Sequence, residues 1–502
     1  MRSYRHVLAR VLVLLVGAEL VVGAGAVPAL GTGSASEGTV LSAEQPRLSW
    51  RGSRLRRSVR RVGRCTRRTC RTFTFRVDNL HPQALLDVRI RWKNRRRNLD
   101  LYLYRDGARV ASSTKRRSRS ERVRLLDPAV GTYRALVVPR RTNRRGTSFR
   151  GRLNLAIPLI DANGLVADCT RDVSRALRTL IASLPDGGTL TFENEGCYRI
   201  DEPVKVVDRA GLTLDGNGAT FRAMTEGDQD RRHFWFIGGS DITVRNLTVR
   251  GANPHAGTGD LAYQGKRAFQ HGFAFHGVQG GLLENVQVYD VFGDFVYFGT
   301  DVRNKKHVPS RSIVVRDSHL ERNGRQGIGI ANAEDITIQN NHISQVRRAT
   351  FDLEPNSPAD VIRRISILDN TTGRGRLLWM ASAGKGFNVN DITIAGNTMV
   401  ARASGGILRL ETPEGGMRGP FTIENNTFLI GGTDRPGFSF VRAHDVTVRN
   451  NQADLPAYRA MTAVGAYGAN TVTVTGNAFT GARTVLFCNA ASAGCTDSAN
   501  AT

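Results

Sequence analysis

Cysteine is scarce in this sequence, with six among 502 residues. No two cysteines form a CxxC pair, and no cluster of histidine and cysteine has zinc-site spacing, so a structural zinc domain is not expected. No glycine-rich piece fits a phosphate-binding loop. The cysteines instead fall into pairs that are close in sequence, although other connectivities stay open. The expected disulfides are Cys65–Cys70, Cys169–Cys197 and Cys488–Cys495.

Long apolar runs are absent beyond residue 26, so no later segment is expected to cross a bilayer. The first residues combine a basic leader (Arg2, Arg5 and Arg10), the apolar run VLVLLVGAELVVG and small residues ending at Ala26. This pattern predicts a secretory signal peptide over 1–26 and a secreted, extracellular protein. A membrane anchor is the alternative, but the run is shorter than the ~20 residues of a span. Export also permits disulfides.

Acidic residues are few relative to basic ones, and the formal net charge is +27. Residues 41–160 hold 33 Lys and Arg against 7 Asp and Glu, whereas residues 161–502 hold 35 basic and 35 acidic residues. The excess charge therefore belongs to one N-terminal block, which predicts attraction to an anionic cell-surface polymer. The alternatives are that the arginines serve solubility or reflect codon bias. Few aromatic residues accompany them beyond Trp50 and Trp92, so specific nucleic-acid recognition is not expected, although salt-sensitive binding to a nucleic-acid backbone stays open.

Residues 27–45 are rich in Gly, Ser and Ala, which is typical of a linker. Residues 46–157 contain short alternating runs such as RTFTFRV and GRLNLAIP, which predict a small antiparallel β-sandwich. The run LDLYLY, the turn at Gly107, the piece VASS and the piece GTY resemble the pre-peptidase C-terminal domain family. That resemblance implies an accessory β-sandwich of a secreted bacterial enzyme. The strongly basic character of this copy is not a feature of that family.

A ten-fold repeat follows, in which an alternating apolar triplet and a spacer residue precede Asn, Asp or Gly, as in ITIQNN and VTVRNN. Successive copies are 23 to 39 residues apart with no helical pattern between them, which predicts a solenoid of short strands. Asn, Asp and Gly tolerate the tight bend after each strand, and stacked Asn amides would hydrogen-bond from coil to coil. The expected bend residues are Gly216, Asn246, Asn285, Asp317, Asn340, Asp369, Gly396, Asn425, Asn450 and Gly476.

The segment before the repeats, DVSRALRTLIASLPDGGTLTFENEGCYRI, places Val173, Leu177, Leu180, Ile181 and Leu184 on one helical face. A helix there would cover the open end of a solenoid. With the repeats, this opening resembles the pectate-lyase superfamily. The resemblance implies an all-β chain in which residues 165–497 form a right-handed parallel β-helix of about ten coils with an N-terminal capping helix. That superfamily includes lyases, hydrolases, epimerases and non-catalytic adhesins, so the reaction stays open.

The strand RATFDLEPNS puts Asp352 and Glu354 on one face and two apolar residues on the other. It belongs to a strand series that resembles the groove-bearing sheet of the superfamily. A solvated surface is the ordinary explanation of such a pair, but glycines on the preceding coil leave room for a ligand. The expected catalytic residues are Asp352, Glu354, Arg409 and Glu411. The expected substrate-binding residues are Trp379 (by stacking on a sugar), Tyr297, His276, Arg325 and Lys385. His271 is a further acid/base candidate, and Asp290 with Asp294 a candidate cation site.

Two mechanisms fit the acid pair. A glycosidase needs one protonated and one ionised carboxyl, ~5–5.5 Å apart for retention or ~6.5–9.5 Å for inversion, which Asp352 with Glu354, or either with Glu411, would approach. By resemblance, a lyase would use Arg409 or Arg325 as base and Asp352 and Glu354 as Ca²⁺ ligands. Residues 161–502 carry no net charge, which favours hydrolysis over elimination.

The sequence therefore predicts a secreted, monomeric enzyme that cleaves a polysaccharide, with no cofactor required unless it is a calcium-dependent lyase. The alternative is a non-catalytic β-helix surface protein that its basic domain targets to polyanions.

Overall fold

The described residues of the computed structural model are 39–43, 45–78, 84–143, 145–158, 160–303, 307–376, 378–382, 384–400, 406–429, 436–455 and 462–502. The predicted signal peptide and most of the predicted linker lie outside them. Within them, no helix has the length and apolar character needed to cross a membrane. The chain divides into two compact units between Ile157 and Pro158.

The N-terminal unit is a β-sandwich of a five-stranded and a four-stranded sheet, as the alternating runs predict. The five-stranded sheet has the order β1 (Val40–Leu41), β3 (Arg71–Val77), β8 (Gly131–Arg141), β5 (Asn98–Arg105) and β6 (Ala108–Ser113). The four-stranded sheet has the order β2 (Arg47–Leu55), β9 (Thr147–Ala156), β4 (Leu85–Arg91) and β7 (Ser120–Leu126). Neighbouring strands are antiparallel, except that β1 runs parallel to β3. Trp50 and Trp92 are both buried in the core between the sheets. A 3₁₀ turn, η1 (Val62–Arg64), precedes the first disulfide.

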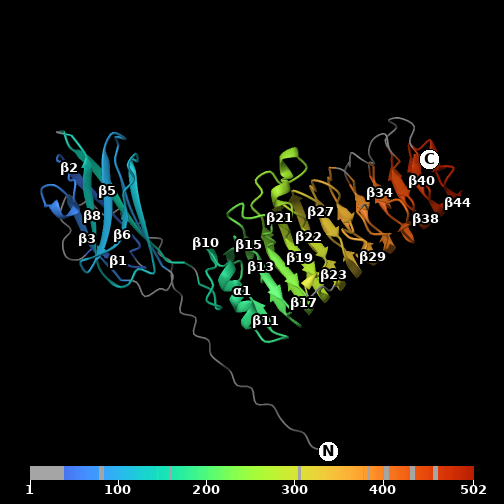
Figure 1. Ribbon diagram of the computed structural model, residues 1–502, viewed down its shortest axis with the longest axis horizontal. Coiled ribbons are helices and arrows are strands. Elements are labelled where there is room, and N and C mark those ends of the chain that lie inside the picture. Colours follow the sequence, from blue (N-terminus) through green and yellow to red (C-terminus); the bar gives the residue numbers. More distant parts are fainter. Residues whose placement is uncertain are drawn as a thin grey trace, which may run out of the picture. The chain divides into compact units, whose positions relative to one another are not determined.

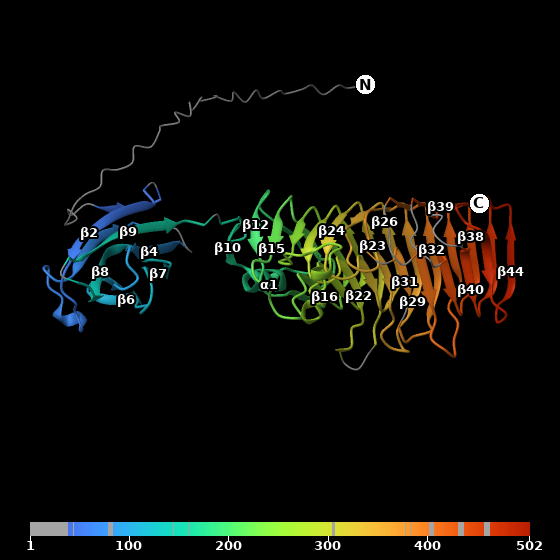
Figure 2. The same ribbon diagram turned by 90° about the horizontal axis from the view of Figure 1, so that it is seen from above.

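The C-terminal unit is a right-handed parallel β-helix, as predicted. Each coil gives one strand in turn to three parallel sheets, here called A, C and B, and successive coils run side by side along the axis (Figures 1 and 2). Sheet A contains β11 (Thr189–Thr191), β14 (Thr213–Asp215), β17 (Ser240–Arg245), β20 (Gln279–Glu284), β23 (Ser310–Arg316), β26 (Ala333–Gln339), β29 (Ile362–Leu368), β32 (Val389–Ala395), β35 (Phe421–Glu424), β38 (His444–Arg449), β41 (Asn470–Thr475) and β44 (Ala493–Ser498).

Sheets B and C complete the coils. Sheet B contains β13 (Val204–Val207), β16 (Phe234–Ile237), β19 (Phe273–His276), β22 (Val296–Gly299), β25 (Ile328–Ile330), β28 (Phe351–Leu353), β31 (Met380–Ser382), β34 (Leu408–Glu411), β37 (Phe438–Val441), β40 (Thr462–Tyr467) and β43 (Thr484–Cys488). Sheet C contains β10 (Asp168–Asp172), β12 (Cys197–Arg199), β15 (Thr220–Arg222), β18 (Thr248–Arg250), β21 (Gln287–Val291), β24 (His319–Asn323), β27 (His342–Ser344), β30 (Thr371–Thr372), β33 (Thr398–Met399), β36 (Thr427–Phe428), β39 (Gln452–Asp454) and β42 (Ala478–Thr480). Two short 3₁₀ turns, η2 (Asp260–Ala262) and η3 (Gly265–Arg267), lie in the long connection between β18 and β19.

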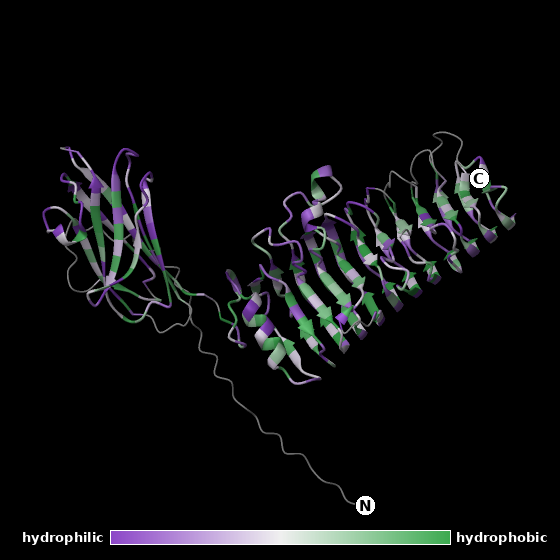
Figure 3. Cartoon of the chain, in the orientation of Figure 1, coloured by the Kyte–Doolittle hydropathy of each residue, from purple (hydrophilic) through white to green (hydrophobic). Residues whose placement is uncertain are grey.

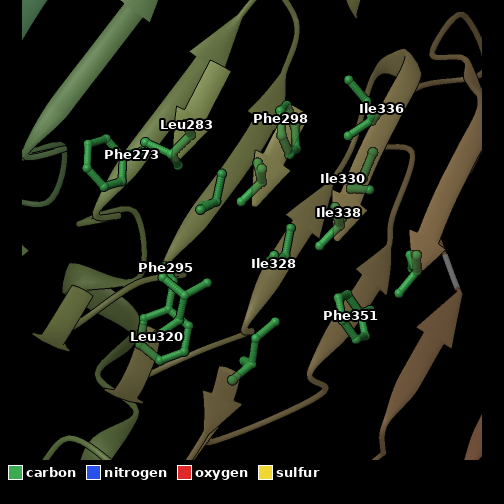
Figure 4. Close-up of a cluster of buried hydrophobic side chains, with 14 of the residues drawn as sticks. Phe273, Leu283, Phe295, Phe298, Leu320, Ile328, Ile330, Ile336, Ile338 and Phe351 are labelled. Atoms are coloured by element: carbon green, nitrogen blue, oxygen red, sulfur yellow. The ribbon is translucent and has the colours of Figure 1, made fainter. Parts of the chain in front are cut away.

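The solenoid core consists of apolar columns that run from coil to coil. Apolar and polar residues alternate along its strands (Figure 3). Side chains from all three sheets meet inside, as Leu283 of sheet A, Leu320 of sheet C and Phe273 of sheet B illustrate (Figure 4). Like residues stack in columns: the ring centroids of Phe275 and Phe298 are 5.6 Å apart. Because each coil buries its apolar face only against its neighbours, the stack folds as a continuous core.

The bends after sheet A adopt the predicted geometry. Nine of the ten expected bend residues have a positive φ, and in the first repeat the positive φ falls on Asn217 rather than Gly216. The residue after each bend forms a ladder within the described coils: Nδ2 of Asn397 donates to Oδ1 of Asn426 at 2.9 Å, and Nδ2 of Asn426 donates to Oδ1 of Asn451 at 2.9 Å. Each amide oxygen also accepts a backbone N–H from the preceding coil, so the ladder satisfies buried groups that no strand pairing reaches.

The predicted capping helix and disulfides are confirmed. Helix α1 (Ser174–Ser183) buries Leu177 and Ile181 against the first coil. The disulfide Cys169–Cys197 joins β10 to β12. The other two disulfides, Cys65–Cys70 and Cys488–Cys495, also pair as expected.

Candidate active site

The candidate active site lies on the outward row of sheet B. Asp352 in β28 is in register with Gly329 on the preceding coil and with Ala381 on the following coil. Its chain neighbours Phe351 and Leu353 are buried in the solenoid core. Since alternate residues of a strand face opposite sides, Asp352 faces outward, as expected from the sequence.

Three carboxylates surround one guanidinium at this row. Arg325 donates from Nη1 to Oδ2 of Asp294 at 2.7 Å and from Nη2 to Oε2 of Glu354 at 3.0 Å. The third carboxylate, Asp352, accepts a 2.6 Å hydrogen bond at Oδ2 from Nε2 of Gln326. Gln326 also donates its backbone N–H to Oδ1 of Asp294 at 2.9 Å. Three successive coils thus contribute to one polar cluster.

This cluster opens to solvent through Glu354. The Glu354 side chain is 39% exposed, whereas Asp352 is 4% exposed and Asp294 is fully buried. Gly329 makes room for the cluster, because a Cβ at that position would lie 2.7 Å from Oδ2 of Asp294. A bound molecule can therefore touch Glu354 directly, while Asp352 lies beneath it.

The acids of the cluster differ in how they hold a proton. Burial raises the pKa of Asp352 well above its usual range, and the adjacent Glu354 carboxyl raises it further. Burial also raises the pKa of Asp294 to about 6, although the Arg325 guanidinium opposes that rise. The charge of Asp294 in turn raises the pKa of Arg325. One guanidinium does not neutralise three carboxylates, so the buried Asp352 binds a proton more readily than an ordinary aspartate, beside an ion-paired Glu354.

Two stacked rings flank the cluster, with the His271 and Tyr297 centroids 4.7 Å apart. The backbone N–H of Asp294 donates to Nδ1 of His271 at 2.9 Å. Burial, with the charge of Arg232, lowers the pKa of His271 well below its usual value. The imidazole is therefore neutral and carries its proton on Nε2, which has no partner within the described residues. Burial raises the pKa of the Tyr297 hydroxyl to about 12, so it stays protonated.

His276 lies further along sheet B, 5.7 Å from Tyr297 between ring centroids. Burial and the charge of Arg232 lower the pKa of His276 to about 4, so the ring is neutral at pH 7. Its neighbour Trp235 is contacted by two cations, Nζ of Lys205 at 4.5 Å and Cζ of Arg232 at 4.1 Å from the ring centroid. This end of the row is cationic and aromatic.

Arg409 and Glu411 lie further along the row in β34 and pair with each other at 2.8 Å. Their side chains are about equally exposed, and neither touches the Asp352 cluster within the described residues. Lys385 has an exposed side chain, and its backbone N–H donates to the carbonyl of Pro355, next to Glu354. Arg409, Glu411 and Lys385 therefore lie outside the Asp352 cluster.

The expectation that Trp379 stacks on a sugar is wrong. Trp379 is buried in the solenoid core, where its ring lies 5.1 Å from that of Phe351 and its Nε1 donates to Oγ1 of Thr372 at 2.9 Å. The strand begins one residue later, at Met380, and Ala381 takes the outward position in register with Asp352. Trp379 lies at the bend directly before the strand, where the alternation of faces does not hold, which is the reason for the error.

The alternation of faces along a strand does not predict Gln326 as a member of the cluster. The sequence predicts Asp294 only as a ligand of a cation. Each lies two residues before its strand, at the bend that leads into sheet B. The signal that identifies them is the repeat itself, because Asp294 and Gln326 occupy the same position ahead of Val296 and Ile328 on successive coils.

The cluster does not fit a calcium ion. Arg325 occupies the space between Asp294 and Glu354, and burial raises the pKa of Asp352, whereas Ca²⁺ binds ionised carboxylates. Among the described residues, no group of three or more His, Cys, Asp or Glu is arranged to hold a metal ion.

Comparison with known proteins finds a family model and several solved structures to which this chain is similar. Residues 204–398 match the family described as right handed beta helix region. A sequence search of curated proteins finds no match.

Several solved structures are similar to this chain. The catalytic unit of a thermostable GH87 alpha-1,3-glucanase from Streptomyces thermodiastaticus is 18% identical, with 86% of this chain and 89% of that chain covered and a TM-score of 0.48. The A-module of a mannuronan C-5 epimerase from Azotobacter vinelandii is 16% identical, with 68% and 89% covered and a TM-score of 0.48. A family 28 exopolygalacturonase from Yersinia enterocolitica is 12% identical, with 84% and 96% covered and a TM-score of 0.46.

Proposed function

We propose that this chain hydrolyses glycosidic bonds of a polysaccharide on sheet B, with the Asp352–Glu354 pair as its acid. The observation that carries the proposal is the buried Asp352, whose pKa is raised by burial and by the adjacent, more exposed Glu354. Glycoside hydrolysis needs a carboxyl that holds a proton near neutral pH and delivers it to the leaving oxygen. Burial and a neighbouring acid raise the pKa of Asp352 in that direction, and Glu354 gives the pair access to a substrate.

In this mechanism the pair transfers its proton to the glycosidic oxygen as the bond from that oxygen to the anomeric carbon breaks. A water molecule attacks the anomeric carbon and gives a proton to a second carboxylate. Asp352 and Glu354 contact each other, which is closer than the ~5–5.5 Å separation of a retaining pair. The second carboxylate must therefore come from elsewhere on the row.

Glu411 is the residue that we assign as the base. Leu353 pairs with Ser382, and Ser382 pairs with Leu410, so Glu411 stands two coils from Glu354. Two strand spacings separate their backbones by roughly 10 Å. Both side chains are exposed and long enough to reduce the distance between the carboxyls to the ~6.5–9.5 Å of an inverting pair. The proposal therefore predicts inversion of the anomeric configuration.

Elimination is the less favoured reaction. A lyase base must accept a proton, and an arginine paired with a carboxylate has only donors to offer. Arg325 is held between two acids, which raise its pKa, and Arg409 is paired with Glu411. Neither arginine is placed to act as a base.

Export remains part of the proposal. Three disulfides in the described chain are compatible with an oxidising compartment. The substrate would then be a polysaccharide outside the cell.

Asp352→Asn and Glu354→Gln test the acid. Each is expected to lower kcat by about 10²–10⁴-fold on a polysaccharide that the wild type cleaves, because the proton donor is lost. Thermal unfolding checks that both variants fold. Asp497→Asn, an exposed acid in β44, is the matched control and should leave kcat unchanged. Wild-type rates in both variants would remove the site, and NMR detection of a retained anomer would remove Glu411 as the base.

A further inference from the structure

The solvent face of the four-stranded sheet in the N-terminal unit is covered by arginine. Residues that alternate with the buried Trp50, Val88, Val123 and Leu153 point outward from β2, β4, β7 and β9. Their register gives three rows across the sheet. The rows are Arg51–Arg150–Arg91–Ser120, Ser49–Arg152–Arg89–Arg122 and Arg47–Asn154–Asp87–Arg124. We call these twelve positions the arginine face.

The charge of the arginine face is almost uncompensated. Asp87 is its one acid, and it pairs with Arg122. Arg91, Arg150 and Arg152 have no ion-pair partner among the described residues. Like charges opposite each other in a sheet repel, so this arrangement costs stability unless a ligand supplies anions.

Arg89, at the centre of the face, shows that repulsion. Burial and then the charges of Arg91 and Arg122 lower the pKa of Arg89. Its Nε atom is also buried without a hydrogen-bond partner within the described chain. The Arg89 guanidinium therefore lies among cations that an incoming oxyanion would neutralise.

A cavity continues the basic surface at one end of the sheet. Arg91 and Ser120 are paired, so the connections that leave β4 and enter β7 run from the same end. A cavity of about 360 Å³ is lined there by Arg95, Arg96, Arg97, Asn98, Arg116, Arg117 and Arg141. No ion pair links any of these six arginines to an acid among the described residues.

The chemistry of the face points to one kind of partner. Every cation on it is arginine, whose planar guanidinium binds sulfate, phosphate and carboxylate oxygens in pairs. The tryptophans of this unit are buried and offer no ring for base stacking. Val110 and Leu126 are the exposed large apolar residues of the described unit, too few to enter a bilayer. A regular plane of guanidiniums is suited to bind an extended polymer that carries anionic groups at short intervals.

We propose that the arginine face binds a linear polysaccharide that bears sulfate or phosphate esters. The face would hold the protein on such a polymer through several oxyanions at once. The inference does not depend on the proposed hydrolysis, because it rests on the N-terminal unit alone.

The test compares two full-length variants that lose the same charge. Arg89, Arg91, Arg150 and Arg152 are changed to Gln in the first, and the exposed Arg56, Arg57, Arg60 and Arg61 are changed to Gln in the control. Binding to dextran sulfate, dextran phosphate and unmodified dextran is measured by calorimetry at low and high salt. The face variant should bind the charged dextrans about tenfold or more weakly than the wild type, with a flatter salt dependence, while the control stays within about threefold. Equal losses in the two variants, or none in either, would overturn the proposal.

Further binding measurements distinguish sulfate from phosphate esters, and a polysaccharide from DNA or a membrane surface. Preference for dextran sulfate or dextran phosphate identifies the ester, and both results support the proposal. Tighter binding to double-stranded DNA or to anionic phospholipid vesicles at matched charge would contradict it. A variant with Lys in place of Arg89, Arg91, Arg150 and Arg152 keeps the charge and guards against a folding failure. It should lose affinity severalfold, and full retention would overturn the role of the guanidiniums.

Discussion

Asp352 occupies a position that a stable solenoid would ordinarily give to a neutral residue. Gly329 and Ala381 hold the equivalent places on the coils beside it. Burying a carboxyl next to Glu354 and Asp294 is unfavourable for the ionised form, so the fold raises the pKa of Asp352. A group whose surroundings hold its proton near neutral pH is suited to act as an acid in catalysis.

The pH dependence of stability should report the buried Asp294. Its pKa is about 6 in the folded chain and near 4 in the unfolded chain, so the folded state binds more protons between these values. Unfolding free energy should therefore fall as pH rises through this window, with a contribution from Asp294 of roughly 3 kcal/mol. Denaturant unfolding of Asp294→Asn at a series of pH values should show a smaller decline than wild type. Asp497→Asn should follow the wild-type curve, and an identical slope in Asp294→Asn would contradict the assignment.

Removal of the Arg325 guanidinium should also lower the unfolding free energy, because Asp294 is buried beside it. Arg325→Met leaves Asp294 buried without its cation, which is expected to cost about 3–5 kcal/mol of unfolding free energy. The double variant with Asp294→Asn should recover much of that loss, because no buried charge is then left unpaired. Chemical denaturation of the four members of this cycle gives the coupling directly. Strictly additive losses would show that the two side chains do not interact as described.

At the scale of elements, the Asn ladder holds the bends of successive coils in line. In mid-ladder, the Asn397 amide accepts from the backbone N–H and from Nδ2 of Asn370, and donates to Asn426 and to the carbonyl of Ile367. These groups lie at a corner that no strand pairing reaches. The ladder therefore replaces hydrogen bonds that the bend removes.

Asn397→Ala should consequently destabilise the solenoid. The substitution removes the acceptor of the Asn370 backbone N–H and one of the two acceptors of its Nδ2, which is expected to cost about 2–5 kcal/mol. Asn500→Ala provides the matched control at the end of the ladder, where Asn477 can bond to water instead. Thermal unfolding of both variants should show the larger loss for Asn397→Ala. Equal losses would mean that burial of the ladder contributes little.

The bends and apolar columns were predictable from the sequence because each is a local pattern that recurs. An Asn after an alternating triplet specifies its own backbone geometry, and ten copies specify the coil. The Trp379 error arose because alternation holds only inside a strand: Trp379 lies at the bend before β31, and the apolar residues around it give no sign of where the strand begins. Gln326 was missed because its role depends on a carboxyl 26 residues away in the chain, on the next coil.

At the scale of the whole molecule, charge separates the two compact units. The N-terminal unit carries nearly all of the net positive charge, and the solenoid is neutral. A unit with a large net charge destabilises itself by repulsion, and salt screens that repulsion within a Debye length of about 10 Å at 0.1 M.

Salt should therefore affect the two units differently. Raising sodium chloride from a few millimolar to about 0.3 M should increase the unfolding temperature of the sandwich and leave that of the solenoid nearly unchanged. Calorimetry of the full chain, with amide hydrogen exchange followed by mass spectrometry to assign each transition to its residues, measures both. A larger increase for the solenoid would contradict this division of charge.

The most direct test of the central claim is a digest of extracellular polysaccharides in which new reducing ends and the ultraviolet absorbance of unsaturated sugar ends are followed together. The panel should include neutral glucans and polyuronates. Hydrolysis at the Asp352–Glu354 pair predicts new reducing ends without that absorbance on at least one polymer. The variant Glu354→Gln should produce no reducing ends on the same polymer. Absorbance that rises with the reducing ends would establish elimination, and no product from a folded protein on any polymer would contradict an enzyme at this site.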